Sequence, residues 1–161
     1  MPQRDSERNV ITLPNKEFIP HIVDLIEKGH TVKLRLKGFS MRPFLEDNRD
    51  VALLTKVTKI KKGDPVLAEI DPGHYVLHRI IKIIGNQLIL RGDGNIACEA
   101  CSTDDVRANI IGFYRKGRTS LDRIDGWKWR LYSWWWTRLY PVRRYLLAFH
   151  RLIIGEKLRR R

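Results

Sequence analysis

Apolar and polar residues change their spacing near residue 30 of the chain. Between Lys16 and Glu27 the apolar side chains recur every three or four positions, which predicts a helix with one buried face. Gly29 suits the end of that helix. From Thr31 to Lys37 apolar and basic residues alternate, and this two-residue period is typical of a strand that buries one face.

Short strand-like segments follow, and most of the joins between them contain Gly, Pro, Asn or Asp. The join Gly85-Asn86 is short enough to close a hairpin. The segments follow one another too closely for helices to lie between them, so an antiparallel or barrel-like arrangement is favoured over a parallel sheet. The predicted strands are Val51 to Leu54, Val66 to Ile70, Tyr75 to Ile84, Gln87 to Arg91 and Asn109 to Tyr114.

Helical spacing returns after Gly117 and predicts two amphipathic helices joined at Pro141. The apolar stripe of the first helix consists of Trp127, Leu131, Trp134, Trp135 and Leu139. The stripe of the second helix consists of Val142, Tyr145, Leu146, Phe149, Leu152 and Ile153.

The chain has 161 residues, which is enough for one domain, and 43% of them are hydrophobic, which is enough to form a core. Its formal net charge of +13 is unevenly distributed. Residues 1–117 carry 19 basic and 15 acidic side chains, whereas residues 118–161 carry 12 basic and 3 acidic ones together with nine of the fifteen aromatic residues. We therefore expect an N-terminal helix and β-rich body over 1–117, followed by a basic, Trp-rich helical tail over 118–161.

Composition excludes several classes of protein. The longest stretch without a charged residue, Ile83 to Leu90, is far shorter than the roughly 18 apolar residues of a membrane-spanning helix. The first residues are polar and lack the apolar segment of a secretory signal, so we expect a cytoplasmic protein. Cys98 and Cys101 form a single C-x-x-C without the further ligands of a zinc site, which predicts reduced thiols and no metal. No ligand spacing is found among His21, His30, His74 and His150.

Three polar residues stand at strands or strand ends in the order serine, histidine, aspartate. Ser40 follows the first predicted strand, His78 lies among apolar neighbours in a later strand, and Asp93 follows the strand that ends at Arg91. A serine hydroxyl becomes a nucleophile when a neutral imidazole accepts its proton, and a carboxylate can orient that imidazole. Taken separately, the three could also be a turn serine, a half-buried strand histidine and a hairpin aspartate.

Together with their neighbours, these residues resemble the conserved boxes of the signal-peptidase-like serine peptidases, a superfamily that includes the autocleaving repressor domains of the SOS response. Since position 78 is His rather than Lys, the resemblance is closest to the archaeal and endoplasmic-reticulum type of signal peptidase. That type usually has an N-terminal membrane anchor, where this chain has the predicted short helix. The resemblance runs from about Leu36 to Arg115, and its segments are Gly38 to Leu45, Asp50-Val51, Lys62 to Val66, Leu77 to Ile80 and Leu90 to Asn95.

The resemblance implies a mainly β, α+β fold: a signal-peptidase/LexA-like body of β-barrel type, here with an N-terminal helix and an amphipathic helical tail. It implies a serine endopeptidase that needs no cofactor and cleaves a peptide or protein. Ser40 would be the nucleophile, His78 the general base and Asp93 the acid that orients the base. The family's second acidic residue lies six positions after the first, which is Glu99 in this chain, with Asp104 as a substitute.

The resemblance also implies where a substrate would bind. The oxyanion hole would use the backbone N–H of Ser40. Some bacterial relatives add a serine hydroxyl two residues earlier, which Gly38 lacks, so a second donor must come from the backbone or from elsewhere. We expect Phe39, Met41 and Pro43, which flank the nucleophile, to contact the substrate.

The tail permits two interpretations. Its helices could attach the protein to the inner face of a membrane, because Trp and Tyr favour the headgroup region and Arg favours anionic lipid. Alternatively, their apolar faces pack on the body and the arginines are solvated. The residues expected at a membrane are Trp127, Trp134, Trp135, Arg138, Arg143 and Arg144.

Two other functions remain as alternatives to a peptidase. The basic, aromatic tail is compatible with nucleic-acid binding, although only about thirty residues precede the first strand, too few for the helix-turn-helix of the repressors. The chain could also be a catalytically inactive homologue that binds a peptide, a membrane or a nucleic acid.

Overall fold

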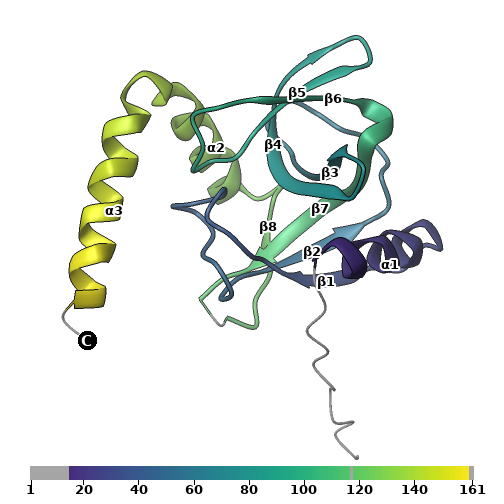
Figure 1. The fold of residues 1–161 in the computed structure, drawn as a ribbon, viewed down its shortest axis with the longest axis horizontal. Helices are drawn as coiled ribbons and strands as arrows, with labels where there is room; N and C mark the ends of the chain where they lie inside the picture. The colour runs from purple at the N-terminus through teal and green to yellow at the C-terminus, as the bar shows by residue number, and fades with distance from the viewer. Residues whose placement is uncertain (1–14, 117, 160–161) are drawn as a thin grey trace, which may run out of the picture.

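A computed structural model of the protein describes residues 15–116 and 118–159 (Figure 1). Within these residues the strands form one antiparallel sheet in the order β1-β2-β7-β3-β4-β5-β6, and β8 pairs with β7. The strands are β1 (Val32–Arg35), β2 (Val51–Thr55), β3 (Pro65–Asp71), β4 (His74–Ile84), β5 (Gln87–Arg91), β6 (Glu99–Ser102), β7 (Val106–Tyr114) and β8 (Asp122–Arg123). The helices are α1 (Asn15–Glu27), α2 (Trp127–Arg138) and α3 (Arg143–Arg159), with 3₁₀ turns η1 (Thr103–Asp105) and η2 (Tyr140–Val142).

The expected mainly β, α+β class is confirmed: the protein is mainly antiparallel β sheet with one N-terminal helix and C-terminal helices. The periodic segments predict their elements to within a residue or two, except that α3 continues six residues beyond Ile153, the end of its predicted stripe. The Gly85-Asn86 join lies in the turn between β4 and β5. Three features have no such periodicity and were not predicted: β6, β8 and the first residues of β7. The residues of β6, Glu-Ala-Cys-Ser, are small or polar, so only their pairing with β5 makes them a strand.

The core consists of two clusters joined by β7, which pairs with β2 on one side and β3 on the other. One cluster lies between α1 and the sheet and receives Ile19, Ile22 and Ile26 from the helix. Their spacing of three and four residues places them on one helix face. The other cluster lies among β3, β4, β5 and the start of β7.

The segment after residue 117 begins as part of this core. β8 pairs with β7, and Trp129 of α2 belongs to the same apolar cluster as the α1 isoleucines. The body and α2 are therefore packed together, but through the face that carries Trp129 and Trp136. The predicted stripe of this helix, with Trp127, Trp134 and Trp135, is exposed, so the interpretation that the stripe packs on the body is wrong for α2. α3 stands at the side of the molecule opposite α1 in Figure 1. No helix in the described part of the chain is both long and apolar enough to cross a bilayer.

Replacing Ile26 with Ala is expected to lower the free energy of unfolding by about 2–5 kcal/mol, because truncating a fully buried side chain leaves a cavity. The neighbouring Leu25→Ala substitution is the matched control, since Leu25 is exposed and should cost far less. Urea unfolding of both variants measures the difference. Equal destabilisation would contradict this packing of α1.

Candidate active site

Ser40 lies in the loop between β1 and β2, and the loop is held by its own side chains. The Gly38 N–H donates to Asp47 Oδ1 at 2.7 Å, and Arg42 Nε donates to Glu46 Oε2 at 2.9 Å. Gly38 has a φ of +91°, a left-handed conformation that costs glycine little and other residues more. The sharp turn before Ser40 therefore requires this glycine.

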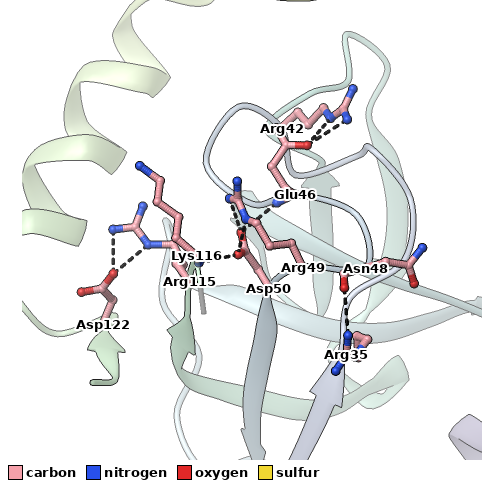
Figure 2. Close-up of polar contacts among 9 residues, drawn as sticks. All are labelled: Arg35, Arg42, Glu46, Asn48, Arg49, Asp50, Arg115, Lys116 and Asp122. Atoms are coloured by element: carbon pink, nitrogen blue, oxygen red, sulfur yellow. Dashed lines mark hydrogen bonds and ion pairs between the residues drawn. The ribbon is translucent and has the colours of Figure 1, made fainter. Parts of the chain in front are cut away.

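Asp50 anchors the far end of the loop, as Figure 2 shows. Its buried carboxylate accepts hydrogen bonds from the Arg49 side chain and from the backbone N–H groups of Glu46 and Lys116, at 2.8–3.0 Å. Burial raises the pKa of Asp50, but the hydrogen bonds from Arg49, Lys116 and Glu46 outweigh it and hold the pKa below its ordinary value. Asp50 is therefore ionised at neutral pH and ties the loop to the end of β7.

His78 lies on β4, is 3% exposed, and has its Nδ1 2.7 Å from Glu99 Oε2. Glu99 begins β6, and β5 lies between β4 and β6. The register pairs Arg79 with Arg91 and Leu90 with Glu99, so the Glu99 side chain reaches His78 across the end of β5. The pairing of the sheet brings together two residues that are 21 positions apart.

The surroundings of His78 favour a neutral imidazole. Burial lowers the pKa of His78, and the carboxylate of Glu99 raises it, with the net pKa below the ordinary 6.5. Because a carboxylate only accepts hydrogen bonds, the bond to Glu99 places the imidazole proton on Nδ1 and leaves Nε2 with its lone pair. This is the form that a general base requires.

Two glycines let the segment after β5 lie directly against the loop that carries Ser40. The Gly94 N–H donates to the Ser40 carbonyl at 2.7 Å, and a Cβ on Gly94 would lie 2.6 Å from the Phe39 carbonyl oxygen. A Cβ on Gly92 would lie 2.3 Å from the Ser40 carbonyl oxygen and 3.0 Å from His78 Nε2. No other residue fits at position 92, where the backbone of Ser40 and the basic nitrogen of His78 both approach.

Ser40, His78 and Glu99 line one pocket of about 270 Å³. Within the described residues, the hydroxyl and the backbone N–H of Ser40 make no hydrogen bond, so both groups are free to meet a substrate. The hydroxyl is thus not hydrogen-bonded to His78 in this structure. Catalytic hydrogen bonds commonly tighten only when substrate is bound.

Asp93 has a different role from the one expected of it. Its carboxylate is 1% exposed and accepts two hydrogen bonds from Arg79. Arg79 Nε lies 2.8 Å from Asp93 Oδ1, and Arg79 Nη2 lies 2.6 Å from Asp93 Oδ2. Arg79 is fully buried, and a buried charge without an opposite charge is strongly destabilising. Asp93 therefore pairs with Arg79 rather than with the imidazole of His78. The expectation that Asp93 orients His78 is wrong in this structure, and Glu99 is the acid that contacts the ring.

Helix α2 completes the surroundings of this ion pair. Arg79 Nη1 donates to Ser133 Oγ at 2.6 Å, and the Arg79 guanidinium lies 4.5 Å from the centre of the Trp129 ring. Tyr132 donates its hydroxyl proton to Asp93 Oδ2 at 3.3 Å, and Trp136 Nε1 donates to the Asp93 carbonyl at 3.0 Å. The inner face of α2 therefore covers the back of the candidate site.

Other expected site residues divide into those in the pocket and those outside it. Met41 lines the pocket, whereas Phe39 and Pro43 do not, and the exposed Phe39 ring lies against the Arg42 guanidinium instead. The Gly38 N–H is bonded to Asp47, so it does not provide a second oxyanion donor in this conformation. Asp104 lies in η1 and pairs with Asn86 of the β4–β5 turn, so it is no substitute for Glu99.

The residues expected at a membrane are exposed on the C-terminal helices. Trp127, Trp134, Trp135 and Arg138 lie on the outer side of α2, and Arg144 is exposed on α3. The side chain of Arg143 lies outside the described residues.

Several residues of the site had no strong signal in the sequence. His74, read as an ordinary histidine, lines the same pocket as Ser40. Arg79 stands in an apolar strand, where a buried charge needs an acidic partner, and the glycines on both sides of Asp93 are typical of a close backbone approach. These two signals could have indicated that Asp93 pairs with Arg79 and that Glu99 contacts His78.

The cysteines lie away from this chemistry. Cys98 is exposed and Cys101 is partly buried on β6, and burial raises the pKa of the Cys101 thiol. In residues 15–116 and 118–159, no group of three His, Cys, Asp or Glu side chains is placed to hold a metal ion.

Comparison with known proteins gives no independent assignment: no family model matches the chain, and no curated protein matches it. The functional proposal therefore depends on the geometry of the site and on the resemblance of its segments.

Replacing Glu99 with Gln is expected to lower the pKa of His78 further, because the substitution removes the carboxylate that favours the imidazolium. Titration of the His78 ring by NMR measures this shift in both proteins. Asp104→Asn is the control, since Asp104 is bonded to Asn86, and it should leave the titration unchanged. A pKa that rises in Glu99→Gln would rule out this pairing.

In the wild type, the lowered pKa means that stability contributed by neutral His78 is present above pH 6.5 and is lost as the pH falls toward the folded pKa.

Asp93→Ala is expected to destabilise the protein by about 3–5 kcal/mol, because it leaves the Arg79 charge buried without a partner. The control is Asp125→Ala, which breaks the exposed Arg123–Asp125 pair and should change stability little. Thermal and urea unfolding compare the two. A small effect at Asp93 would show that Arg79 does not depend on it.

Proposed function

We propose that the protein is a serine endopeptidase of the signal-peptidase-like type, with Ser40 as nucleophile, His78 as general base and Glu99 as the acid that orients it. One observation carries the proposal: a buried His78 with a lowered pKa bonds Glu99 through Nδ1, while its Nε2 and the Ser40 backbone approach the same point at Gly92. An imidazole that lines the Ser40 pocket and has an unprotonated Nε2 can remove the proton of a hydroxyl.

In the first half of the reaction, Ser40 Oγ bonds to the carbonyl carbon of the scissile peptide while His78 Nε2 takes the hydroxyl proton. Glu99 stabilises the imidazolium through Nδ1. The unbonded Ser40 N–H supports a role in binding the oxyanion. The C–N bond then breaks, the imidazolium protonates the leaving amine, and the acyl group remains on Ser40.

In the second half, water enters the pocket and loses a proton to His78 as its oxygen attacks the ester. The bond to Ser40 Oγ breaks, the proton returns to this oxygen, and the carboxylic acid product leaves. No metal or cofactor takes part in these steps.

We also assign the antiparallel sheet to the signal-peptidase and SOS-repressor barrel type. The order of the segments along the chain supports this assignment, as does the convergence of the nucleophile loop, β4 and the segment after β5 on one pocket. A cytoplasmic location stays a prediction.

Ser40→Ala is expected to lower cleavage of a susceptible peptide by at least about 10³-fold, because no nucleophile remains for the acyl-enzyme. Purified wild type and variant are incubated with a peptide library derived from a cell lysate, and new termini are identified by mass spectrometry. Ser120→Ala, a change in an exposed loop serine, is the control and should cleave like the wild type.

Two results would overturn the proposal. One is a set of new termini that is the same in wild type and Ser40→Ala. The other is a folded wild type that cleaves neither the library nor its own chain, which would favour a homologue that only binds its partner.

A further inference from the structure

Helix α3 turns its apolar stripe away from the protein. Tyr145, Phe149 and Leu152 are 61%, 64% and 68% exposed, and they lie on one helix face by their spacing of four and three residues. Leu147, on the opposite side, is buried near the segment that follows Asp93. An amphipathic helix of a globular protein normally turns its apolar side to the core, so this orientation leaves the stripe without a partner in the described structure.

Helix α2 has the same division between two faces. Its inner face, with Trp129 and Trp136, packs on the body, whereas Trp127, Trp134 and Trp135 on the outer face are 71%, 47% and 54% exposed. The inner face already covers the Arg79–Asp93 pair, so the outer tryptophans are not needed for packing there. Two consecutive helices therefore expose large apolar side chains.

The charge of this surface has one sign. No Asp or Glu occurs between Asp125 and Glu156, and the basic side chains in that interval include Lys128, Arg130, Arg138 and Arg144, all of them exposed. Arg138 lies 4.3 Å from the centre of the exposed Trp134 ring, so the cation and the aromatic ring form one patch. An occupant of this surface must accept apolar side chains and carry negative charge.

We propose that the outer faces of α2 and α3 dock the protein on an anionic lipid bilayer. Both helices would lie in the interface, since neither is long and apolar enough to cross it. Trp and Tyr side chains favour the headgroup region, and Arg and Lys side chains meet the anionic headgroups. One surface of this kind accommodates both the apolar and the basic side chains that the two helices expose.

Other occupants fit these helices less well. A second copy of the chain would bring two surfaces of the same positive sign together, which is unfavourable. A nucleic acid would accept the arginines but would leave aliphatic side chains such as Leu152 and Ile153 in water. The bilayer is therefore the occupant that the combination of charge and apolar area favours.

The experiment is sedimentation of the full-length protein with vesicles. We expect binding to vesicles of phosphatidylcholine mixed with phosphatidylglycerol, weaker binding to phosphatidylcholine alone, and release at high salt. The docking does not depend on catalysis, so Ser40→Ala should bind like the wild type. A loss of peptidase activity can thus be told apart from a loss of docking.

Two pairs of variants test the surface, each with a control. The double change Phe149→Ser and Leu152→Ser should weaken partitioning about tenfold or more, because two apolar side chains no longer enter the bilayer. Ile84→Ser, at an exposed apolar position on β4, is its control. Arg138→Gln with Arg144→Gln should reduce the preference for anionic vesicles. Lys56→Gln with Lys82→Gln removes the same charge elsewhere and should not.

The wild type remaining in the supernatant with anionic vesicles would overturn the proposal, as would equal losses in the test and control variants. A concentration-dependent dimer lost in Phe149→Ser and Leu152→Ser, with no vesicle binding, would identify a second copy as the occupant. Binding to DNA but not to vesicles would identify nucleic acid. Because the substituted side chains are exposed, the variants should keep the melting temperature of the wild type, which verifies that they are folded.

Discussion

The buried ion pair between Arg79 and Asp93 is the interaction on which the arrangement of the rest of the site depends. Arg79 follows His78 in β4, and Asp93 lies between the two glycines that approach the Ser40 loop. Neither charge is exposed, and an unpaired ion would cost several kcal/mol in this position. The remaining hydrogen bonds of the pair go to the Gly63 carbonyl and to α2, so separate parts of the chain meet behind the pocket that Ser40 and His78 line.

The same pair explains how two acids near one histidine have different roles. Asp93 is held by a guanidinium that presents two parallel N–H donors, which is the geometry a carboxylate accepts best. Glu99 begins a strand at the end of the sheet, where its longer side chain reaches Nδ1 of His78 and is partly open to solvent. Asp93 therefore stabilises the fold around His78, and Glu99 sets the tautomer of the imidazole.

Helix α2 connects this site to the outer surface of the molecule. One face supplies Tyr132, Ser133 and Trp136 to the ion pair, and the other exposes aromatic and basic side chains. The stripe predicted for α2 is thus its exposed face, and the helix packs on the body through the opposite face. Packing on the body accounts for the inner residues, and docking on a lipid surface is proposed for the outer ones.

The residue pattern alone was enough to predict α1 and the strands from β1 to β5, because burying one face imposes a period locally. It also predicted the two C-terminal helices, although their periodic apolar stripes are exposed. It also indicated Ser40 and His78 through their neighbours. The folded chain was needed to see that Glu99 rather than Asp93 contacts His78, that β6 is a strand, and that the apolar stripe of α3 faces outward. These outcomes depend on contacts between residues that are distant in the sequence. The sheet register brings Glu99 to His78, and the buried Arg79 pairs with Asp93 because a buried charge without an opposite charge is costly.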